Sequence, residues 1–264
     1  MSAATRLRRL QEDANITVYE MGENVSYANC GLPYFISDTI SDRQALLLQT
    51  PQSLHSRFRL DVKTNHKVVA INKSAKQVTV QNLQTGETFE DGYDSLVLAT
   101  GAKPRKPNIP GIEHALTLRD VEDADVLKAA AQKSQTKTAV IIGGGFIGIE
   151  TAENLVHAGF NVHLVQRGSQ LLSLAEPEIV EVMQKHLEAN GIKLHLNADL
   201  TEITETTVVV NGTSIVTDLV ISAAGVEPDN QLARDAGLKF GETGGLWVDE
   251  QQRTSDANIY AAGD

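Results

Sequence analysis

The sequence has almost no cysteine, with one among 264 residues. A single thiol cannot form an internal disulfide, which excludes a disulfide-stapled secreted domain. Long apolar runs are missing too: none could span a bilayer, and MSAATRLRRL at the N-terminus has no apolar signal-peptide core. We therefore expect no membrane partner and, by default, a cytoplasmic location.

Basic charge is also in deficit. The chain has 34 acidic and 23 basic residues, which gives a formal net charge of −11. Nonspecific nucleic-acid binding needs a basic face, so we expect no nucleic-acid partner, although local patches do not exclude an anionic ligand. The length and the hydrophobic fraction of 41% predict a globular protein of one or two domains. We assign no metal-binding residues.

Glycine, by contrast, forms the strongest local motif. TKTAVII (136–142) reads as a buried strand, and Gly143, Gly145 and Gly148 follow it in G-x-G-x-x-G spacing. IGIETAENLVHAG then reads as a helix, with Ile147 on its apolar face, and FNVHLVQ (160–166) reads as a second strand. A glycine-rich turn alone could belong to any α/β protein, but this order of elements favours dinucleotide binding.

The residue at the end of the second strand normally contacts the 2′ position of the cofactor ribose. An acidic residue there accepts the ribose hydroxyls of NAD, whereas this sequence has Gln166 and then Arg167. Gln166 carries no charge to repel a 2′-phosphate, and Arg167 could pair with one. The alternative is that Arg167 is a solvated loop residue and NADH binds through Gln166. The pattern favours NADPH slightly and is compatible with both cofactors.

The N-terminal part resembles the later portion of a second such unit. AATRLRRLQEDA (3–14) has helical spacing of apolar residues, and NITVYE is a strand that ends at Glu20. A helix followed by an acid-ended strand is the second and third part of a βαβ unit, but the first strand and its glycine loop are not in the sequence. Glu20 would suit ribose hydroxyls; otherwise it is a solvent-exposed strand end.

An internal repeat supports two related modules. DSLVLATGAKP (94–104) and DLVISAAGVEP (218–228) share an Asp, an apolar strand, a Gly and a Pro at the same spacing. KPRKPNIPGIE (103–113) reads as a linker, and NIYAAGD gives one more strand and turn. We predict an FAD-binding domain over 1–112, an NAD(P)-binding domain over 113–240, and a return to the first domain over 241–264.

The single cysteine lies in SYANCGLPYF (26–35), among polar and turn-forming residues. Cys30 follows Asn29, and Pro33 suits the first turn of a helix. The positive end of a helix dipole favours thiolate, the nucleophilic form. A free cysteine is more often an inert, buried small hydrophobe, but this turn shortly after an acid-ended strand indicates a site.

Together these motifs resemble the pyridine nucleotide-disulfide oxidoreductases. The most similar branch has a single active-site cysteine and includes coenzyme A-disulfide reductases, NAD(P)H persulfide reductases and NADH oxidases. SYANCGLPY resembles the active-site signature, RLRRL with the acid-ended strand resembles the flank of the FAD site, and LVLATGAKP, GGGFIGIE, ISAAGVEP and IYAAGD occur in the family's order. The resemblance covers essentially the whole chain.

The resemblance implies an α/β fold of two related Rossmann-like modules in three ββα layers, one for FAD and one for NAD(P), with the FAD module incomplete. It implies hydride transfer from NAD(P)H to FAD and then reduction of a disulfide between Cys30 and a small thiol such as coenzyme A. A persulfide reductase would use Cys30 to attack a persulfide sulfur, and an NADH oxidase would cycle it through a sulfenic acid. A non-catalytic NAD(P)-binding remnant is a further alternative.

The resemblance also assigns cofactor contacts. Glu150 would lie near the contact of nicotinamide and flavin, and Phe146 would gate the nicotinamide pocket; the sequence alone would make them a surface charge and a packing residue. The complete implied set is Glu20, Asn29, Val69, Thr100, Gly101, Gly143, Gly145, Phe146, Ile147, Gly148, Glu150, Gln166, Arg167, Gly225, Gly263 and Asp264.

For coenzyme A, the resemblance implies Ser2, Arg6, Arg9, Ser26, Asn29 and Arg57. Arg6 and Arg9 are three residues apart, so both can lie on one helix face, and guanidinium groups bind phosphates well. An exposed basic face is the alternative. In the family, the first strand and FAD glycine loop would precede Met1, and the dimerisation domain of the homodimeric relatives would follow Asp264. We therefore expect a truncated product or a fragment.

Overall fold

The computed structural model describes residues 1–264 and divides them into two compact units. Unit 1 comprises Met1–Tyr27, Leu47–Lys103 and Pro228–Asp264; unit 2 comprises Ala28–Leu46 and Pro104–Glu227. These bounds differ from the predicted 1–112, 113–240 and 241–264. The main reason is that the segment around Cys30 packs within unit 2. The chain changes unit within β9 (Ala102–Pro104) and β17 (Val226–Pro228).

Unit 2 is built on a parallel sheet of strand order β12–β11–β10–β16. The strands are β10 (Thr138–Ile142), β11 (Asn161–Val165), β12 (Lys193–His195) and β16 (Leu219–Ser222), and Leu116 bridges Ile221 beyond β16. All of β16 and the last four residues of β10 are buried. Continuous apolar burial is what a parallel strand covered on both faces requires.

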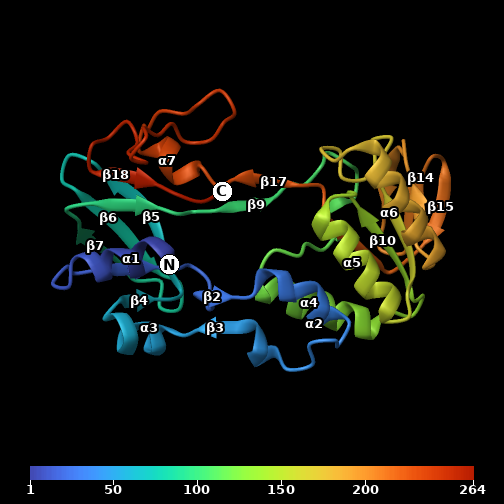
Figure 1. The fold of residues 1–264 in the computed structure, drawn as a ribbon, viewed down its shortest axis with the longest axis horizontal. Coiled ribbons are helices and arrows are strands. Elements are labelled where there is room, and N and C mark those ends of the chain that lie inside the picture. Colours follow the sequence, from blue (N-terminus) through green and yellow to red (C-terminus); the bar gives the residue numbers. More distant parts are fainter. The chain divides into compact units, whose positions relative to one another are not determined.

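Two further layers cover this sheet (Figure 1). Helix α5 (Phe146–His157) packs on β10 and β11, and α6 (Pro177–Ala189) packs on β12. An antiparallel meander of β13 (Leu200–Ile203), β14 (Thr207–Val210) and β15 (Thr213–Val216) shares a buried cluster with Val140 and Ile142. Because alternate side chains of a strand point to opposite faces, the unit has the predicted three-layer ββα arrangement.

Unit 2 also holds a small helical subdomain. It contains the 3₁₀ turns η1 (Asn29–Gly31) and η2 (Arg43–Leu46) and the helices α2 (Leu32–Ile36) and α4 (Val121–Lys133), whereas the 3₁₀ turn η3 (Ile112–His114) contacts β13. Helix α4 begins at Asp120, whose side chain accepts the Asp123 backbone N–H. Helix α2 packs against α4 and α5.

Unit 1 has the same kinds of element in shorter sheets. Its parallel pairs are β1 (Thr17–Tyr19) with β4 (Asp61–Lys63) and β8 (Leu96–Leu98) with β18 (Ile259–Ala261). Strands β5 (His66–Asn72), β6 (Gln77–Asn82) and β7 (Thr88–Gly92) form an antiparallel sheet, and β2 (Ser26–Tyr27) pairs with β3 (Leu47–Gln49). The helices are α1 (Ser2–Leu10), α3 (Pro51–Phe58) and α7 (Gln231–Asp235).

Helix α1 is shorter than the pattern over 3–14 predicts, because it ends at Leu10. The guanidinium of Arg8 donates to the carbonyl oxygens of Gln11 and Glu12, and Gln11 has extended backbone. These carbonyls are therefore satisfied by a side chain instead of by further helical turns. No helix of either unit has the length and apolar character needed to cross a bilayer.

Candidate functional site

The glycine loop of unit 2 joins the end of β10 to the start of α5. Gly143 has φ +110°, and a Cβ there would collide with the Ala223 carbonyl; a Cβ on Gly148 would collide with the Gly143 carbonyl oxygen. Gly145 is the N-cap of α5, and a Cβ there would meet no other atom within 4 Å. Two glycines are thus needed by the fold, and the third leaves room for a ligand beside unpaired helix N–H groups.

Around this loop lie several of the other predicted contacts. Phe146 and Ile147 in the first turn of α5 are 74% and 43% exposed, and Glu150 one turn later is half-buried. Gly225, at φ +95°, follows β16 and has open space around it. Because β10 and β16 are parallel neighbours, the turns that follow them lie at the same edge of the sheet, where α/β proteins bind nucleotides.

Gln166 makes a contact that the sequence did not indicate. Its Oε1 accepts the backbone N–H of Gly144 at 3.0 Å, so the residue at the end of β11 holds the glycine loop itself. Since the Gly144 N–H needs an acceptor, the amide orientation is settled. The polar atom left to meet a ligand is Nε2, a donor, and Arg167 beside it is exposed.

Cys30 is exposed within η1, directly before α2. Cys30 is therefore not the buried small hydrophobe of the alternative interpretation. Pro33 lies in the first turn of α2, as predicted, and the helix buries Leu32, Pro33, Phe35 and Ile36. Gly31 is buried so tightly that a Cβ would lie 2.9 Å from the Leu46 side chain, which accounts for glycine next to the thiol.

Polar contacts attach residues Ala28–Leu46, the Cys30 segment, to the helices of unit 2. Lys128 of α4 pairs with Asp38 at 2.5 Å and lies 3.8 Å from the centre of the Phe35 ring. Arg43 Nε donates to both carboxylate oxygens of Asp125, at 3.0 and 2.8 Å. The Ser37 hydroxyl donates to Asn154 Oδ1 of α5 at 2.7 Å. These long-range partners carry no local sequence signal.

In unit 1, the predicted flavin contacts lie at strand ends and at one irregularity. Glu20 follows β1, and its Oε1 accepts the Gly22 N–H at 2.7 Å. The β5–β6 register shifts between Val68 and Ala70, so Val69 has no partner on β6 and is 40% exposed. The bulge therefore sets Val69 apart from the regular β5–β6 pairing.

Thr100 and Gly101 follow β8 and are held by one residue. Thr100 Oγ1 donates to the Asp229 carbonyl, and the Asp229 N–H donates to the Gly101 carbonyl, each at 2.8 Å. Gly101 has φ +67°, which favours glycine. This fixed turn corresponds to the turn at Gly225 in the internal repeat.

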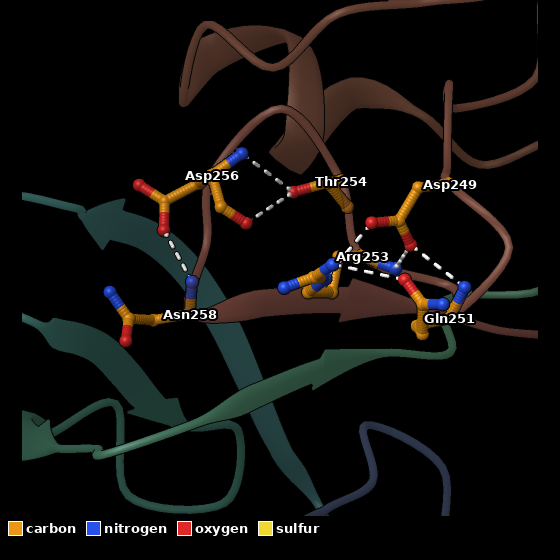
Figure 2. A network of polar contacts seen from close by, with 6 residues as sticks. All are labelled: Asp249, Gln251, Arg253, Thr254, Asp256 and Asn258. Atoms are coloured by element: carbon orange, nitrogen blue, oxygen red, sulfur yellow. Dashed lines mark hydrogen bonds and ion pairs between the residues drawn. The ribbon is translucent and has the colours of Figure 1, made fainter.

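Gly263 and Asp264 follow β18. The segment that leads into β18 is held by the polar network in Figure 2. Asp249 accepts the Gln251 and Arg253 N–H groups and the Arg253 guanidinium, each at 2.9 Å. The Arg253 N–H is the main cause of a pKa of Asp249 below its ordinary value, despite some opposing burial. Thr254 and Asp256 close the turn that leads into β18.

The predicted substrate residues are exposed or half-buried in unit 1, except Asn29, which is exposed in unit 2. Ser2, Arg6 and Arg9 are exposed on α1, Arg57 is exposed on α3, and Ser26 lies half-buried on β2. Sequence reasoning missed Arg8, which is 9% exposed and donates to the Phe58 and Arg59 carbonyls at 2.8 and 3.0 Å. Arg8 therefore joins α1 to the end of α3.

The whole chain, residues 1–264, matches the family described as pyridine nucleotide-disulphide oxidoreductase. The chain belongs to this family. The predicted family and the α/β fold class are thus confirmed. No group of three or more His, Cys, Asp or Glu side chains in residues 1–264 is arranged to hold a metal ion.

Three known proteins illustrate the similarity. Coenzyme A disulfide reductase of Staphylococcus haemolyticus is 33% identical over 264 residues, which are 100% of this chain and 60% of that protein. The structure of reduced Bacillus anthracis CoADR-RHD is 42% identical with a TM-score of 0.96, covering 100% of this chain and 48% of that one. A NAD-dependent persulfide reductase from A. fulgidus is 36% identical with a TM-score of 0.93, covering 99% and 50%.

The chain therefore spans 60% of the curated relative and about half of each of the two solved structures. The two solved structures share its fold over essentially its full length, and the two proteins named as reductases are oxidoreductases. These relatives support the predicted class of oxidoreductase, while their substrates differ.

Proposed function

We propose that this chain is an FAD- and NAD(P)H-dependent oxidoreductase that reduces a small disulfide, such as coenzyme A disulfide, through Cys30. The observation that carries the proposal is the position of the only cysteine. Cys30 is exposed, and its segment packs in the unit that also has the complete glycine loop. The single free thiol suits a reducing compartment such as the cytoplasm.

The residues of unit 2 fit a pyridine nucleotide. The open position at Gly145 and the unpaired N–H groups of the first turn of α5 would hold the pyrophosphate, and Glu150 would lie further along the same helix. For FAD, unit 1 would contribute Glu20, Val69 at the bulge of β5, and the turns at Gly101 and Gly263. The two cofactors, when bound, supply the electron pair for the reaction.

Cys30 would act as the nucleophile. Its thiolate attacks one sulfur of the substrate disulfide; the substrate S–S bond breaks, one thiolate leaves and takes a proton from solvent, and a mixed disulfide forms on Cys30. Two electrons and a proton then reduce this mixed disulfide, which releases the second thiol and restores the Cys30 thiolate. Because the chain has no second cysteine, no internal disulfide can replace the mixed one.

The basic residues of α1 and α3 would bind the phosphates of a coenzyme A group. Arg6, Arg9 and Arg57 are exposed, so their guanidinium groups can pair with phosphate oxygens. Arg8 supports this role because it ties the two helices together through backbone carbonyls. Replacing Arg6 and Arg9 with Met should weaken the binding of coenzyme A disulfide more than the binding of a disulfide without phosphates.

Either nicotinamide cofactor is compatible with the end of β11. The fixed Gln166 Nε2 can donate to a ribose oxygen or to a 2′-phosphate, and the exposed Arg167 can pair with the phosphate. We infer use of both, with a slight preference for NADPH. The Arg167→Gln variant should then weaken NADPH binding and leave NADH binding unchanged.

The test is to purify the chain and its Cys30→Ser variant and to follow NADH and NADPH oxidation with coenzyme A disulfide, with a persulfide and with oxygen. Disulfide turnover that disappears in the variant supports the proposal. Turnover with oxygen alone would instead support the NADH oxidase alternative. Colourless protein that binds NAD(P)H but releases no flavin on denaturation would support the non-catalytic remnant.

A further inference from the structure

A partly buried hydrogen bond joins the Cys30 segment to the helix that follows the glycine loop. Ser37, the C-cap residue of α2, donates through its hydroxyl to Asn154 Oδ1 at 2.7 Å. Asn154 is 4% exposed, and its Nδ2 donates to the Glu150 carbonyl at 2.8 Å. Because a carbonyl can only accept, this second bond fixes the amide orientation and turns Oδ1 towards Ser37.

The link connects two positions that matter to the proposed reaction. Asn154 lies eight residues after Phe146 in α5, or about 12 Å along the helix axis from the loop end. Cys30 lies seven residues before Ser37, at the other end of α2. A helix of five residues has no stability of its own, so its neighbours determine where α2 lies.

Besides the apolar packing of α2 on α4 and α5, two ion pairs hold the segment. In the Lys128–Asp38 pair, the Asp38 side chain is 64% exposed, and in the Arg43–Asp125 pair both side chains are about one-third exposed. Exposed ion pairs contribute little and are screened by salt. Breaking the Ser37–Asn154 bond leaves a buried amide oxygen without its partner, which costs more than losing an exposed contact.

We propose that Ser37 and Asn154 are positioning residues, which hold the Cys30 segment against α5 so that a nucleotide at the glycine loop changes the reactivity of the thiol. Phosphates bound at the first turn of α5 order that helix, and the hydrogen bond extends this ordering to α2. The inference rests on the proposed function in two respects: Cys30 is taken as the reacting thiol, and NADH is taken to bind at the glycine loop.

The experiment measures the rate of Cys30 alkylation by iodoacetamide, and amide hydrogen exchange over residues 28–38, each with and without saturating NADH. In the unaltered chain, NADH should slow both. In Ser37→Ala, exchange of the segment should rise about fivefold, as expected for loss of one hydrogen bond, and the response of Cys30 to NADH should disappear. Ser37→Thr keeps the hydroxyl and should restore the response.

Ser134→Ala is the matched control. Ser134 is another serine of unit 2, and its hydroxyl donates to Asp218 at 2.6 Å before the amino end of β10, away from the glycine loop. This variant should lose stability without altering the Cys30 response. An unchanged response in Ser37→Ala, or the same change in both variants, would overturn the proposal.

Neither measurement requires disulfide turnover, so this inference and the proposed function can fail separately. A chain that lacks turnover but shows the Ser37-dependent response would keep the link and lose the function. Asn154→Ala provides a second variant, because it removes both hydrogen bonds of the amide and should reproduce the effect of Ser37→Ala on a folded chain.

Discussion

Unit 1 and unit 2 differ most at the centre of their parallel sheets. In unit 2, β10 pairs with β11 on one side and with β16 on the other. The internal repeat equates β8 of unit 1 with β16, and β1 with β11, yet β1 pairs with β4 and β8 pairs with β18, and no strand joins β1 to β8. Val97 of β8 is 48% exposed, whereas Ile221 at the same place in the repeat is fully buried.

The difference shows that the central strand of such a unit, β10 in unit 2, has both a structural and a ligand-binding role. In unit 2, β10 buries the edges of its two neighbours and also leads into the glycine loop, so sheet integrity and phosphate binding depend on the same residues. In unit 1, open edges at β1 and β8 accompany the lack of an equivalent loop in residues 1–264. Unit 1 should therefore be both the softer unit and the weaker nucleotide binder.

The largest expected effect is in hydrogen exchange. Backbone amides of β1 and β8 that face the unpaired edges should exchange at least about a hundredfold faster than those of β10 and β16, because opening them disrupts fewer hydrogen bonds and less apolar burial. The measurement is amide exchange resolved by peptide or by residue at neutral pH. Equal protection from exchange in β1 and β8 and in β10 and β16 would mean that the open edges are covered, and the two units would not differ as described.

The glycine loop allows a matched pair of substitutions in unit 2. Gly148→Ala places a methyl group against the Gly143 carbonyl oxygen, so it should destabilise the unit by about 3 kcal/mol and abolish NADH binding. Gly145→Ala enters open space and should weaken NADH binding with almost no loss of stability. Denaturant unfolding and calorimetric titration separate the two effects. Equal stability losses would contradict the assignment of Gly145 to the ligand.

The sequence predicted those parts of the fold that depend on neighbours in the chain. The strand, glycine loop and helix of unit 2 follow from residues 136–159, and the helix at Pro33 follows from its turn residues. The packing of the Cys30 segment in unit 2 could not be predicted, because it depends on Asp125, Lys128 and Asn154, about a hundred residues later. The same holds for the contact of Gln166 with the loop, which exists only once β10 and β11 pair.

Arg8 is a second feature that no local pattern reveals, and it tests the stability of unit 1. Its guanidinium donates to carbonyl oxygens after α1 and at the end of α3. Arg8→Met should leave the Phe58 and Arg59 carbonyls without their charged donor and destabilise unit 1 by about 2–3 kcal/mol. Arg9→Met, at an exposed position on the same helix, is the control and should change the unfolding free energy by less than about 0.5 kcal/mol.

The smallest expected effect is that of low pH, which should reduce the stability of unit 2 and so narrow the stability difference between the units. His163 of β11 and His195 of β12 share a hydrogen bond of 2.9 Å between ring nitrogens, with the rings tilted by only 10°. Burial, the charge of Lys193 and the neighbouring His195 lower the pKa of His163 to about 4, and burial with Lys193 also lowers the pKa of His195. The folded pair is therefore neutral over a pH range in which the unfolded chain is protonated.

Because the unfolded state binds more protons, the stability that this pair contributes is complete above about pH 6.5 and falls as the pH drops towards 4. We expect unit 2 to lose about 1–2 kcal/mol between pH 7 and pH 4.5, allowing for solvent near the rings. His163→Phe should flatten this slope, whereas the exposed His114→Asn should not. Chemical denaturation across this pH range measures the slope. An unchanged slope in His163→Phe would assign the acid sensitivity to carboxylates instead of to the histidine pair.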